Sequence, residues 1–158
     1  MKNSFLVLLL TFLILASASA YAWTGQVVAV TDGDTIKVLQ DGRETKVRLY
    51  GVDTPEKKQA FGQKAKGFTA SLVAGRMVDV EPVDQDRYGR TVGLVTVAGQ
   101  SLNEELVKNG FAWVYQQYCR RGECSAWTKE ELQARAARLG LWADPAPLPP
   151  WEWRRTKK

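Results

Sequence analysis

Acidic and basic side chains gather in one short stretch of the sequence, Val30 to Glu56, which reads VTDGDTIKVLQDGRETKVRLYGVDTPE. Its acids stand before one β-branched run and after the next, with an arginine between them: Asp32, Asp34, Asp53, Glu56 and Arg48. An aspartate in such a place is commonly a turn residue that hydrogen-bonds its own backbone. However, Asp41-Gly42 predicts a tight hairpin, which would put the start of one strand beside the end of the next. We therefore expect Asp34 and Asp53 to converge at one rim of a sheet.

Two converging carboxylates raise each other's pKa unless a cation lies between them. A hard divalent ion with oxygen ligands, Ca²⁺ or Mg²⁺, suits such a site, and an exported protein meets calcium readily. In this interpretation Asp32 is either a ligand or a residue behind the ligands. Thr54 offers its backbone carbonyl or its hydroxyl.

Arg48 is of the type that binds a phosphodiester, because a guanidinium group can bind two oxygens of the anion and stays charged at any working pH. Val47 and Leu49 alternate with Lys46, Arg48 and Tyr50, so Arg48 faces away from the main apolar row. A solvated, outward-facing residue is the alternative interpretation.

The composition narrows the possible chemistry. The chain has no histidine, which excludes Ser-His and Cys-His nucleophile pairs. A general base must therefore be a carboxylate. The two cysteines, Cys119 and Cys124, predict a disulfide in an oxidising compartment, and two cysteines without histidine argue against a zinc site.

The N-terminus predicts export. Residues 1–22 resemble a secretory signal, with Lys2, an apolar run, and small residues that allow cleavage after Ala20 or Ala22. An uncleaved anchor is the alternative, but the apolar run is shorter than the ~20 residues that a bilayer span needs. We expect a periplasmic or secreted monomer that has no membrane segment after cleavage.

The rest of the chain suits one domain, residues 23–143, followed by a proline- and tryptophan-rich basic tail, residues 144–158. The formal net charge is +5, and Arg154, Arg155, Lys157 and Lys158 less Glu152 supply +3 of it. The charge is thus weak support for a nucleic-acid partner. The tail would be an arm laid over the domain, a nonspecific phosphate contact or solvated chain.

The periodicity predicts five strands and three helices. The strands are expected at residues 25–30, 35–39, 45–50, 77–83 and 91–97. One helix should span Gln59–Ala74, and a second should start at Ser101. A third should run from about Ser125 to Leu139, with Thr128 and Glu131 at the spacing of a capping box. This α+β pattern suits a small barrel closed by helices.

Three ordered motifs, DGDT, VRLYGVDTPE and DRYGR, resemble the staphylococcal nuclease (thermonuclease-like) family, and the resemblance runs roughly from Gly25 to Trp142. It implies a five-stranded OB-fold barrel with three helices. It also implies Ca²⁺-dependent hydrolysis of DNA and RNA that leaves 3′-phosphate ends.

The resemblance implies a metal site and a catalytic set. Asp34 and Asp53 would bind Ca²⁺ through their carboxylates and Thr54 through its backbone carbonyl, with Asp32 adjacent to the ion. Glu56 would activate or orient the attacking water, and Arg48 and Arg90 would bind the phosphate.

Each of these residues has a simpler alternative. Glu56 could be a helix-initiating acid after Pro55, favoured by the helix dipole. Arg90 lies in a plausible β-turn that begins at Asp86.

Four further residues resemble nucleotide contacts: Arg87, Tyr88, Tyr115 and Tyr118. The tyrosine that stacks on the base could be Tyr115 or Tyr118, and both could instead be packing groups. The cysteine pair and the tail depart from the staphylococcal enzyme.

Two other classes of protein stay open. A noncatalytic OB-fold module would bind nucleic acid or another partner without cleaving it. An exported structural or interaction protein would use its acids to bind calcium for stability alone.

Overall fold

The computed structural model describes residues 21–157. The expected signal of residues 1–22 therefore lies outside the described residues, except for Tyr21 and Ala22, and so does Lys158. Within residues 21–157, no helix is long and apolar enough to cross a membrane.

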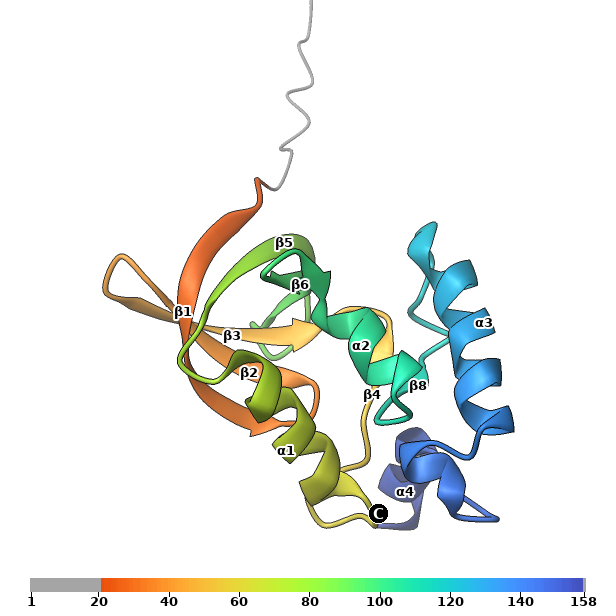
Figure 1. Cartoon of the computed structure of the whole chain (residues 1–158). Helices are drawn as coiled ribbons and strands as arrows, with labels where there is room; N and C mark the ends of the chain where they lie inside the picture. The colour runs from red at the N-terminus through yellow and green to blue at the C-terminus, as the bar shows by residue number, and fades with distance from the viewer. Residues whose placement is uncertain (1–20, 158) are drawn as a thin grey trace, which may run out of the picture.

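Five strands form a closed barrel, which confirms the expected OB-type architecture (Figure 1). They are β1 (Trp23–Asp32), β2 (Thr35–Gln40), β3 (Arg43–Leu49), β5 (Met77–Gln85) and β6 (Thr91–Val97). The strand order is β3-β2-β1-β5-β6, and parallel pairing of β3 with β6 closes the barrel. The short strand β7 (Gln100–Ser101) pairs with β6.

The hairpin between β2 and β3 has the predicted turn. Gln40 pairs with Arg43, and Asp41 and Gly42 both have positive φ angles, 48° and 77°. Those are the angles of a two-residue type I′ turn, which explains the Asp-Gly pair. At the far end of the hairpin Thr35 pairs with Arg48, so Arg48 lies beside the start of β2.

Alternating side chains of the strands fill the barrel, as the two-residue period of a strand requires. The fully buried ones include Val27, Ile36, Val38, Val47, Leu49, Val78, Val80 and Val95. This core fixes the register of β2 and β3, because a slip of one residue would turn these side chains outward.

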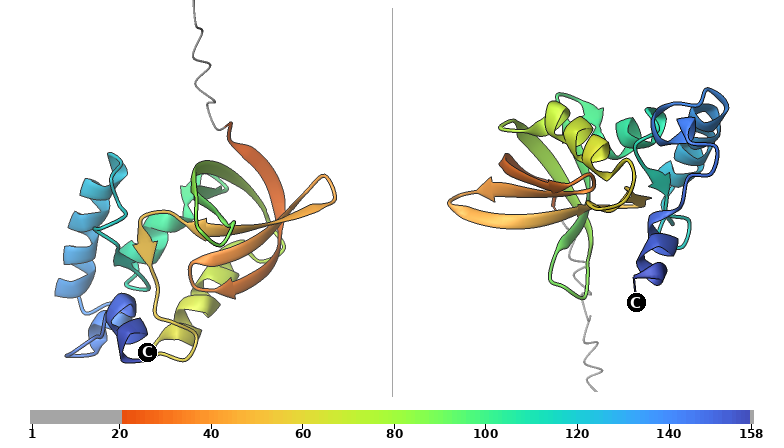
Figure 2. Two further views of the ribbon diagram at one scale, coloured as in Figure 1. Left: turned by 180° about the vertical axis from the view of Figure 1, so that it is seen from behind. Right: turned by 90° about the horizontal axis from the view of Figure 1, so that it is seen from below.

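Four α-helices cover the barrel and its flank (Figures 1 and 2). They are α1 (Gly62–Val73), α2 (Leu102–Lys108), α3 (Glu123–Ala136) and α4 (Pro150–Thr156), and a 3₁₀ helix, η1, spans Gly140–Ala143. The predicted cap of α2 is confirmed, because the Ser101 hydroxyl accepts a hydrogen bond from the Glu104 N–H at 3.3 Å.

The third expected helix is present as α3, with its start two residues earlier than expected. The helix begins at Glu123, not Ser125, and Thr128 lies inside it, where its hydroxyl donates to the Cys124 carbonyl at 2.8 Å. A threonine that bonds the carbonyl of the preceding turn has no role as a cap. The first helix also begins later than expected, at Gly62 rather than Gln59.

The three expected helices of the domain are α1, α2 and α3, and the tail adds a fourth, α4, that was not expected. Proline is favoured in the first turn of a helix, and Pro150 stands there. Trp151 packs against a buried cluster made of Trp113, Ala134, Leu141 and Trp142. Of the alternatives for the tail, the arm laid over the domain agrees with the structure.

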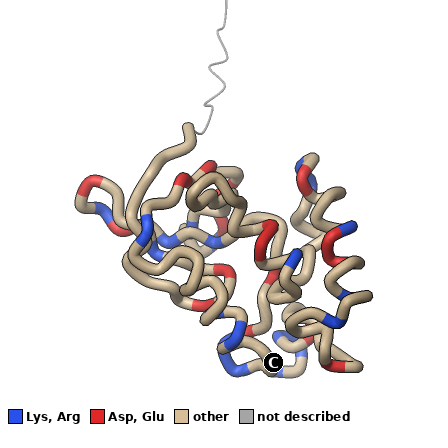
Figure 3. The backbone as a smooth tube through the Cα atoms, in the orientation of Figure 1, with Lys and Arg blue, Asp and Glu red and all other residues tan. Residues whose placement is uncertain are grey.

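A second, two-stranded sheet connects the barrel to the helical flank. In it β4 (Val52–Asp53) pairs with β8 (Trp113–Val114), with Asp53 opposite Trp113. Basic and acidic residues are interspersed along the chain (Figure 3), so the electrostatics of any site depend on local pairs rather than on one charged face.

Candidate active site

One open groove of about 1010 Å³ holds every residue that the sequence predicts for a site. Its lining includes Asp32, Asp34, Arg48, Asp53, Thr54, Glu56, Arg87, Tyr88, Arg90, Tyr115 and Tyr118. These side chains come from the end of β1 and the turn that follows it, from β3, from β4 and the segment after it, from the β5–β6 turn and from the segment after β8.

The two ends of the hairpin region meet where Asp34 contacts Thr54, the residue that follows Asp53. The buried Asp34 carboxylate accepts hydrogen bonds at Oδ2 from the Thr54 backbone N–H at 2.8 Å and from the Thr54 hydroxyl at 2.9 Å. These two bonds hold the start of β2 against the segment that follows β4.

The cation between the carboxylates is the Arg48 guanidinium. Its Nη2 lies 3.2 Å from Asp34 Oδ2 and 2.9 Å from Asp53 Oδ1, so both carboxylates face one nitrogen atom. Its Nη1 donates to the carbonyls of Leu49 and Val52, at 2.8 Å each. The Arg48 side chain is only 15% exposed, which excludes the solvated alternative.

The three aspartates of the site differ in pKa. Burial raises the pKa of Asp53 to about 6, although Arg154 and Arg48 oppose this effect. Burial and the neighbouring Asp34 raise the pKa of Asp32 to about 7. For Asp34 burial acts in the same direction, but Arg48 and the Thr54 hydrogen bonds outweigh it and lower the pKa. Asp34 is therefore the carboxylate that stays charged most readily.

Glu56 is not a helix-initiating acid, since α1 begins six residues later, at Gly62. A tight turn fixes it, in which the Glu56 N–H donates to Gln59 Oε1 at 3.0 Å. A Cβ on Gly62 would lie 2.0 Å from the Glu56 carbonyl oxygen, so the turn requires glycine there. The Glu56 carboxylate lies 2.7 Å from the guanidinium of Arg154.

Arg90 lies in the predicted turn and belongs to the groove as well. Asp86 accepts from the Arg90 N–H at 3.0 Å and from Arg90 Nε at 2.7 Å, and from the Tyr88 N–H at 2.9 Å. The slight burial of Asp86 opposes ionisation, but the bonds from Arg90 lower its pKa. The turn thus delivers Arg90 to the groove.

The candidate nucleotide contacts differ in exposure. Tyr88 and Tyr118 are 68% and 57% exposed, and Arg87 Nη2 donates to the Tyr88 hydroxyl at 2.7 Å. Tyr115 is partly buried and stacks on Trp151, with ring centroids 5.2 Å apart and an interplanar angle of 8°.

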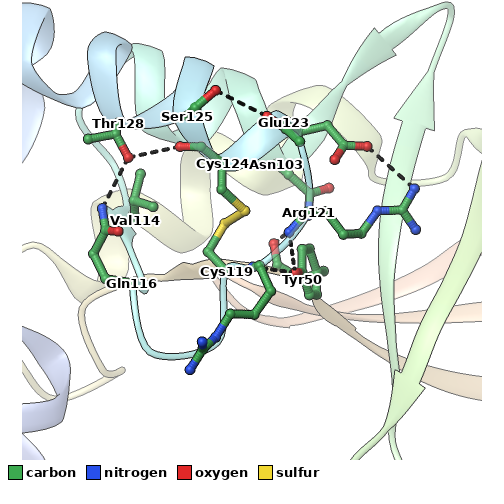
Figure 4. Close-up of a disulfide and its surroundings, with 12 residues drawn as sticks. Tyr50, Asn103, Val114, Gln116, Cys119, Arg121, Glu123, Cys124, Ser125 and Thr128 are labelled. Carbon is green, nitrogen blue, oxygen red and sulfur yellow. Dashed lines mark hydrogen bonds and ion pairs between the residues drawn. A yellow bond between two sulfur atoms is a disulfide. The ribbon is translucent and has the colours of Figure 1, made fainter.

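The predicted disulfide between Cys119 and Cys124 is present and closes the loop before α3 (Figure 4). The Tyr50 hydroxyl accepts hydrogen bonds from the N–H groups of Arg120 and Arg121, at 2.7 and 3.1 Å. Because Tyr50 directly follows β3, this loop is tied to the strand that carries Arg48.

The sequence reasoning missed Arg154, Trp151 and Gln59. The signal for the first two was present: Pro150 predicts a helix start, and a spacing of three residues puts Trp151 and Arg154 on one helix face. Gln59 has no comparable signal, because its two side-chain bonds, from Glu56 N and to the Leu148 carbonyl, depend on the fold.

The groove offers hard oxygen donors but no large cluster of them. Over residues 21–157, no group of three or more His, Cys, Asp or Glu side chains is placed to hold a metal ion. The oxygen donors of the groove include the carboxylates of Asp34 and Asp53, the oxygens of Thr54 and the adjacent carboxylate of Asp32. Such a set fits an ion that completes its shell with water.

Comparisons with known proteins agree with this fold. Residues 46–144 match the model of the family described as staphylococcal nuclease homologue. A protein named "Micrococcal nuclease" from Shigella flexneri is 39% identical over 155 residues, covering 92% of this chain and 88% of its own. The "Uncharacterized endonuclease" of Haemophilus influenzae is 41% identical over 152 residues, covering 96% and 84%.

A third relative, "Protein ParB" of Escherichia coli, is 41% identical over 155 residues, which cover 92% of this chain and 87% of that protein. A barrel with this acid and arginine groove defines a protein of the OB-fold nuclease class. The chain belongs to the staphylococcal nuclease family. The family and the names of these relatives support a nuclease.

Proposed function

We propose that the protein is an exported Ca²⁺-dependent nuclease that hydrolyses phosphodiester bonds of DNA and RNA with low sequence specificity and leaves 3′-phosphate ends. The observation that carries the proposal is the position of Arg48 between the carboxylates of Asp34 and Asp53, with Glu56 and Arg90 in the same groove.

Asp34 and Asp53 would hold the ion through their carboxylates, Thr54 through its backbone carbonyl, and Asp32 would lie adjacent as a ligand or behind the ligands. When bound, Ca²⁺ supplies positive charge for the phosphate and a place for water. The remaining oxygen ligands would be water molecules, which calcium accepts readily.

Three side chains of the groove have separate catalytic roles in this proposal. Glu56 is the carboxylate in the groove that can accept a proton from water, and no histidine is available for that role. Arg48 is held by two carbonyls, so its guanidinium is preorganised to stabilise negative charge on the phosphate. Arg90 supplies a second cation from the β5–β6 turn.

Substrate binding would combine phosphate contacts and stacking. Arg87 can bind phosphate, and the exposed rings of Tyr88 and Tyr118 offer surfaces on which bases can stack. The Tyr115 ring is stacked on Trp151, so a base could stack on that face only if the Trp151 ring moved away. Such contacts recognise features common to all nucleotides, which supports low sequence specificity for DNA and RNA.

Export is supported by the signal-like residues 1–22 and by the disulfide, which forms in oxidising compartments. We propose that the mature protein acts in the periplasm or outside the cell, as a monomer and without a membrane segment.

Labelled single-stranded DNA and RNA, incubated with the whole mature chain in Ca²⁺ and in chelator, test this proposal. Cleavage only in Ca²⁺ is expected. Binding without cleavage would instead favour the noncatalytic OB-fold module. A rise in melting temperature with Ca²⁺, but neither binding nor cleavage, would favour the calcium-stabilised structural protein.

A further inference from the structure

Arg154, from the C-terminal helix, reaches the acids that the proposed function uses. Its Nη2 lies 2.8 Å from Asp53 Oδ2, and its Nη1 lies 2.7 Å from Glu56 Oε1 and 3.3 Å from Asp53 Oδ1. One guanidinium group therefore bridges a proposed metal ligand and the proposed water-activating carboxylate, although about a hundred residues of chain separate it from them.

The helix that carries Arg154 is docked on the domain. The Trp151 ring stacks on Tyr115 and meets the Trp113 ring edge-on, with centroids 5.6 Å apart. Pro150 is buried, and the Leu148 carbonyl accepts a hydrogen bond from Gln59 Nε2 at 2.6 Å. Figure 1 shows α4 close to the segment that joins β4 to α1. The packing thus aims Arg154 into the groove.

The contacts of Asp53 show what the guanidinium does there. Asp53 Oδ1 is bound by Arg48 and Arg154, and Oδ2 is bound by Arg154. The Asp53 side chain is only 2% exposed, so these oxygens receive little water. A divalent cation that binds Asp53 must share or replace these hydrogen bonds, and it is repelled by the charge of Arg154.

We propose that Arg154 is a positioning residue that holds Asp53 and Glu56 in place and competes with the divalent cation for the Asp53 carboxylate. Docking of α4 then sets the cation affinity of the site. A cation that enters displaces the guanidinium from Asp53, whose strongest bond is to Nη2, while the bond from Nη1 to Glu56 can persist. This inference rests on the proposed function, since it takes Asp53 as a ligand.

Calorimetric titration of the whole mature chain with Ca²⁺ alone tests the competition. Arg154→Ala should bind Ca²⁺ roughly tenfold more tightly than the wild type, because the cation no longer displaces a charge-assisted pair. Arg155→Ala is the matched control, since it removes the same charge from the next position, which is exposed. It should change the affinity less than twofold.

Two further variants separate competition from a loss of structure. Arg154→Gln keeps the length of the side chain without its charge and should also tighten Ca²⁺ binding. Arg154→Lys keeps the charge and should bind Ca²⁺ close to the wild-type affinity. For Arg154→Ala and Arg154→Gln, the rise in melting temperature on adding Ca²⁺ should exceed that of the wild type, because the ion replaces the missing partner of Asp53.

The outcomes are distinct. If Asp34→Asn abolishes Ca²⁺ binding while Arg154→Ala and Arg154→Gln bind as the wild type or more weakly, the competition is refuted and the proposed metal site stands. If the wild type and Arg154→Ala both fail to bind Ca²⁺, the proposed function fails and this inference fails with it. If Arg155→Ala binds Ca²⁺ as tightly as Arg154→Ala does, the tighter binding is a general effect of the lost charge. That result would also refute a specific role for Arg154.

Discussion

The Arg48 guanidinium and the Asp53 carboxylate form an ion pair of 2.9 Å, in which the side chains are only 15% and 2% exposed. Desolvated pairs of this kind are costly to break, since the partner keeps a buried charge. In this groove the arginine is also fixed by the carbonyls of Leu49 and Val52. The Arg48–Asp53 pair therefore stabilises the fold and also fixes the positions of both side chains in the groove.

Replacing Arg48 by alanine should lower the turnover number on single-stranded DNA by about 10²- to 10³-fold, the usual effect of losing one preorganised electrophilic group. Arg48→Lys should stay strongly impaired, because an ammonium group cannot bind two carbonyls and two carboxylates in one plane. Steady-state kinetics measure this, with circular dichroism to show that the fold is retained. Arg43→Ala, at the exposed start of β3, is the control. Turnover of Arg48→Ala within threefold of the wild type would remove Arg48 from the mechanism.

Glu56→Gln should lower turnover by about 10²- to 10⁴-fold, because the amide cannot accept the proton of the attacking water. Its stability should change by only ~0.5 kcal/mol, since both partners of the Arg154–Glu56 pair are 40% exposed. Single-turnover cleavage and urea unfolding measure the two effects. Glu152→Gln, an exposed acid on α4, should leave turnover unchanged. A fully active Glu56→Gln would mean that another group accepts the proton.

Removing the disulfide by Cys119→Ser with Cys124→Ser should lower the free energy of unfolding by about 2 kcal/mol, the value expected for closure of so short a loop. The loop should also loosen around Tyr50, whose hydroxyl binds the N–H groups of Arg120 and Arg121. Urea unfolding measures the first effect, and exchange of these two amides measures the second. Unchanged stability and unchanged exchange protection would show that the loop is held by its other contacts alone.

Glu130 predicts a pH dependence of stability. Burial, and then the neighbouring Glu104, raise its pKa from 4.5 to about 7. Because the folded state holds this proton more tightly than the unfolded state, the contribution to stability is fully present below pH 4.5 and is lost as the pH rises to about 7. Glu130→Gln keeps the neutral form at every pH. It should raise the melting temperature more at pH 8 than at pH 4; an equal shift at both values would contradict the raised pKa.

Much of the groove could be predicted from the sequence because its determinants are local. The Asp-Gly turn fixes the β2–β3 hairpin, and the alternation of Val47, Arg48 and Leu49 fixes the face of the arginine. Together they bring Asp34 and Asp53 to one rim without knowledge of the rest of the fold. The β5–β6 turn that carries Arg90 is likewise a local signal.

The part contributed by α4 could be predicted only in part, because Pro150 marks a helix start but does not say where the helix docks. Prolines between Asp144 and Pro150 break the periodicity, so the short helix that follows has too few residues to show an amphipathic pattern. Its docking depends on Trp113 and Tyr115, whose positions are set by the pairing of β8 with β4. From the sequence alone, the cation between the carboxylates of Asp34 and Asp53 is expected to be a metal ion. In the structure, Arg48 and Arg154 also neutralise these carboxylates.

The most direct test of the account is the rate of single-stranded DNA cleavage by the whole mature chain as the Ca²⁺ concentration is raised from a chelated start. We predict no cleavage in chelator, saturable cleavage with added Ca²⁺, products with 3′-phosphate ends, and no activity at any Ca²⁺ concentration when Asp34 and Asp53 are both replaced by asparagine. Equal rates with Ca²⁺ and with chelator, or full activity of the double variant, would contradict it.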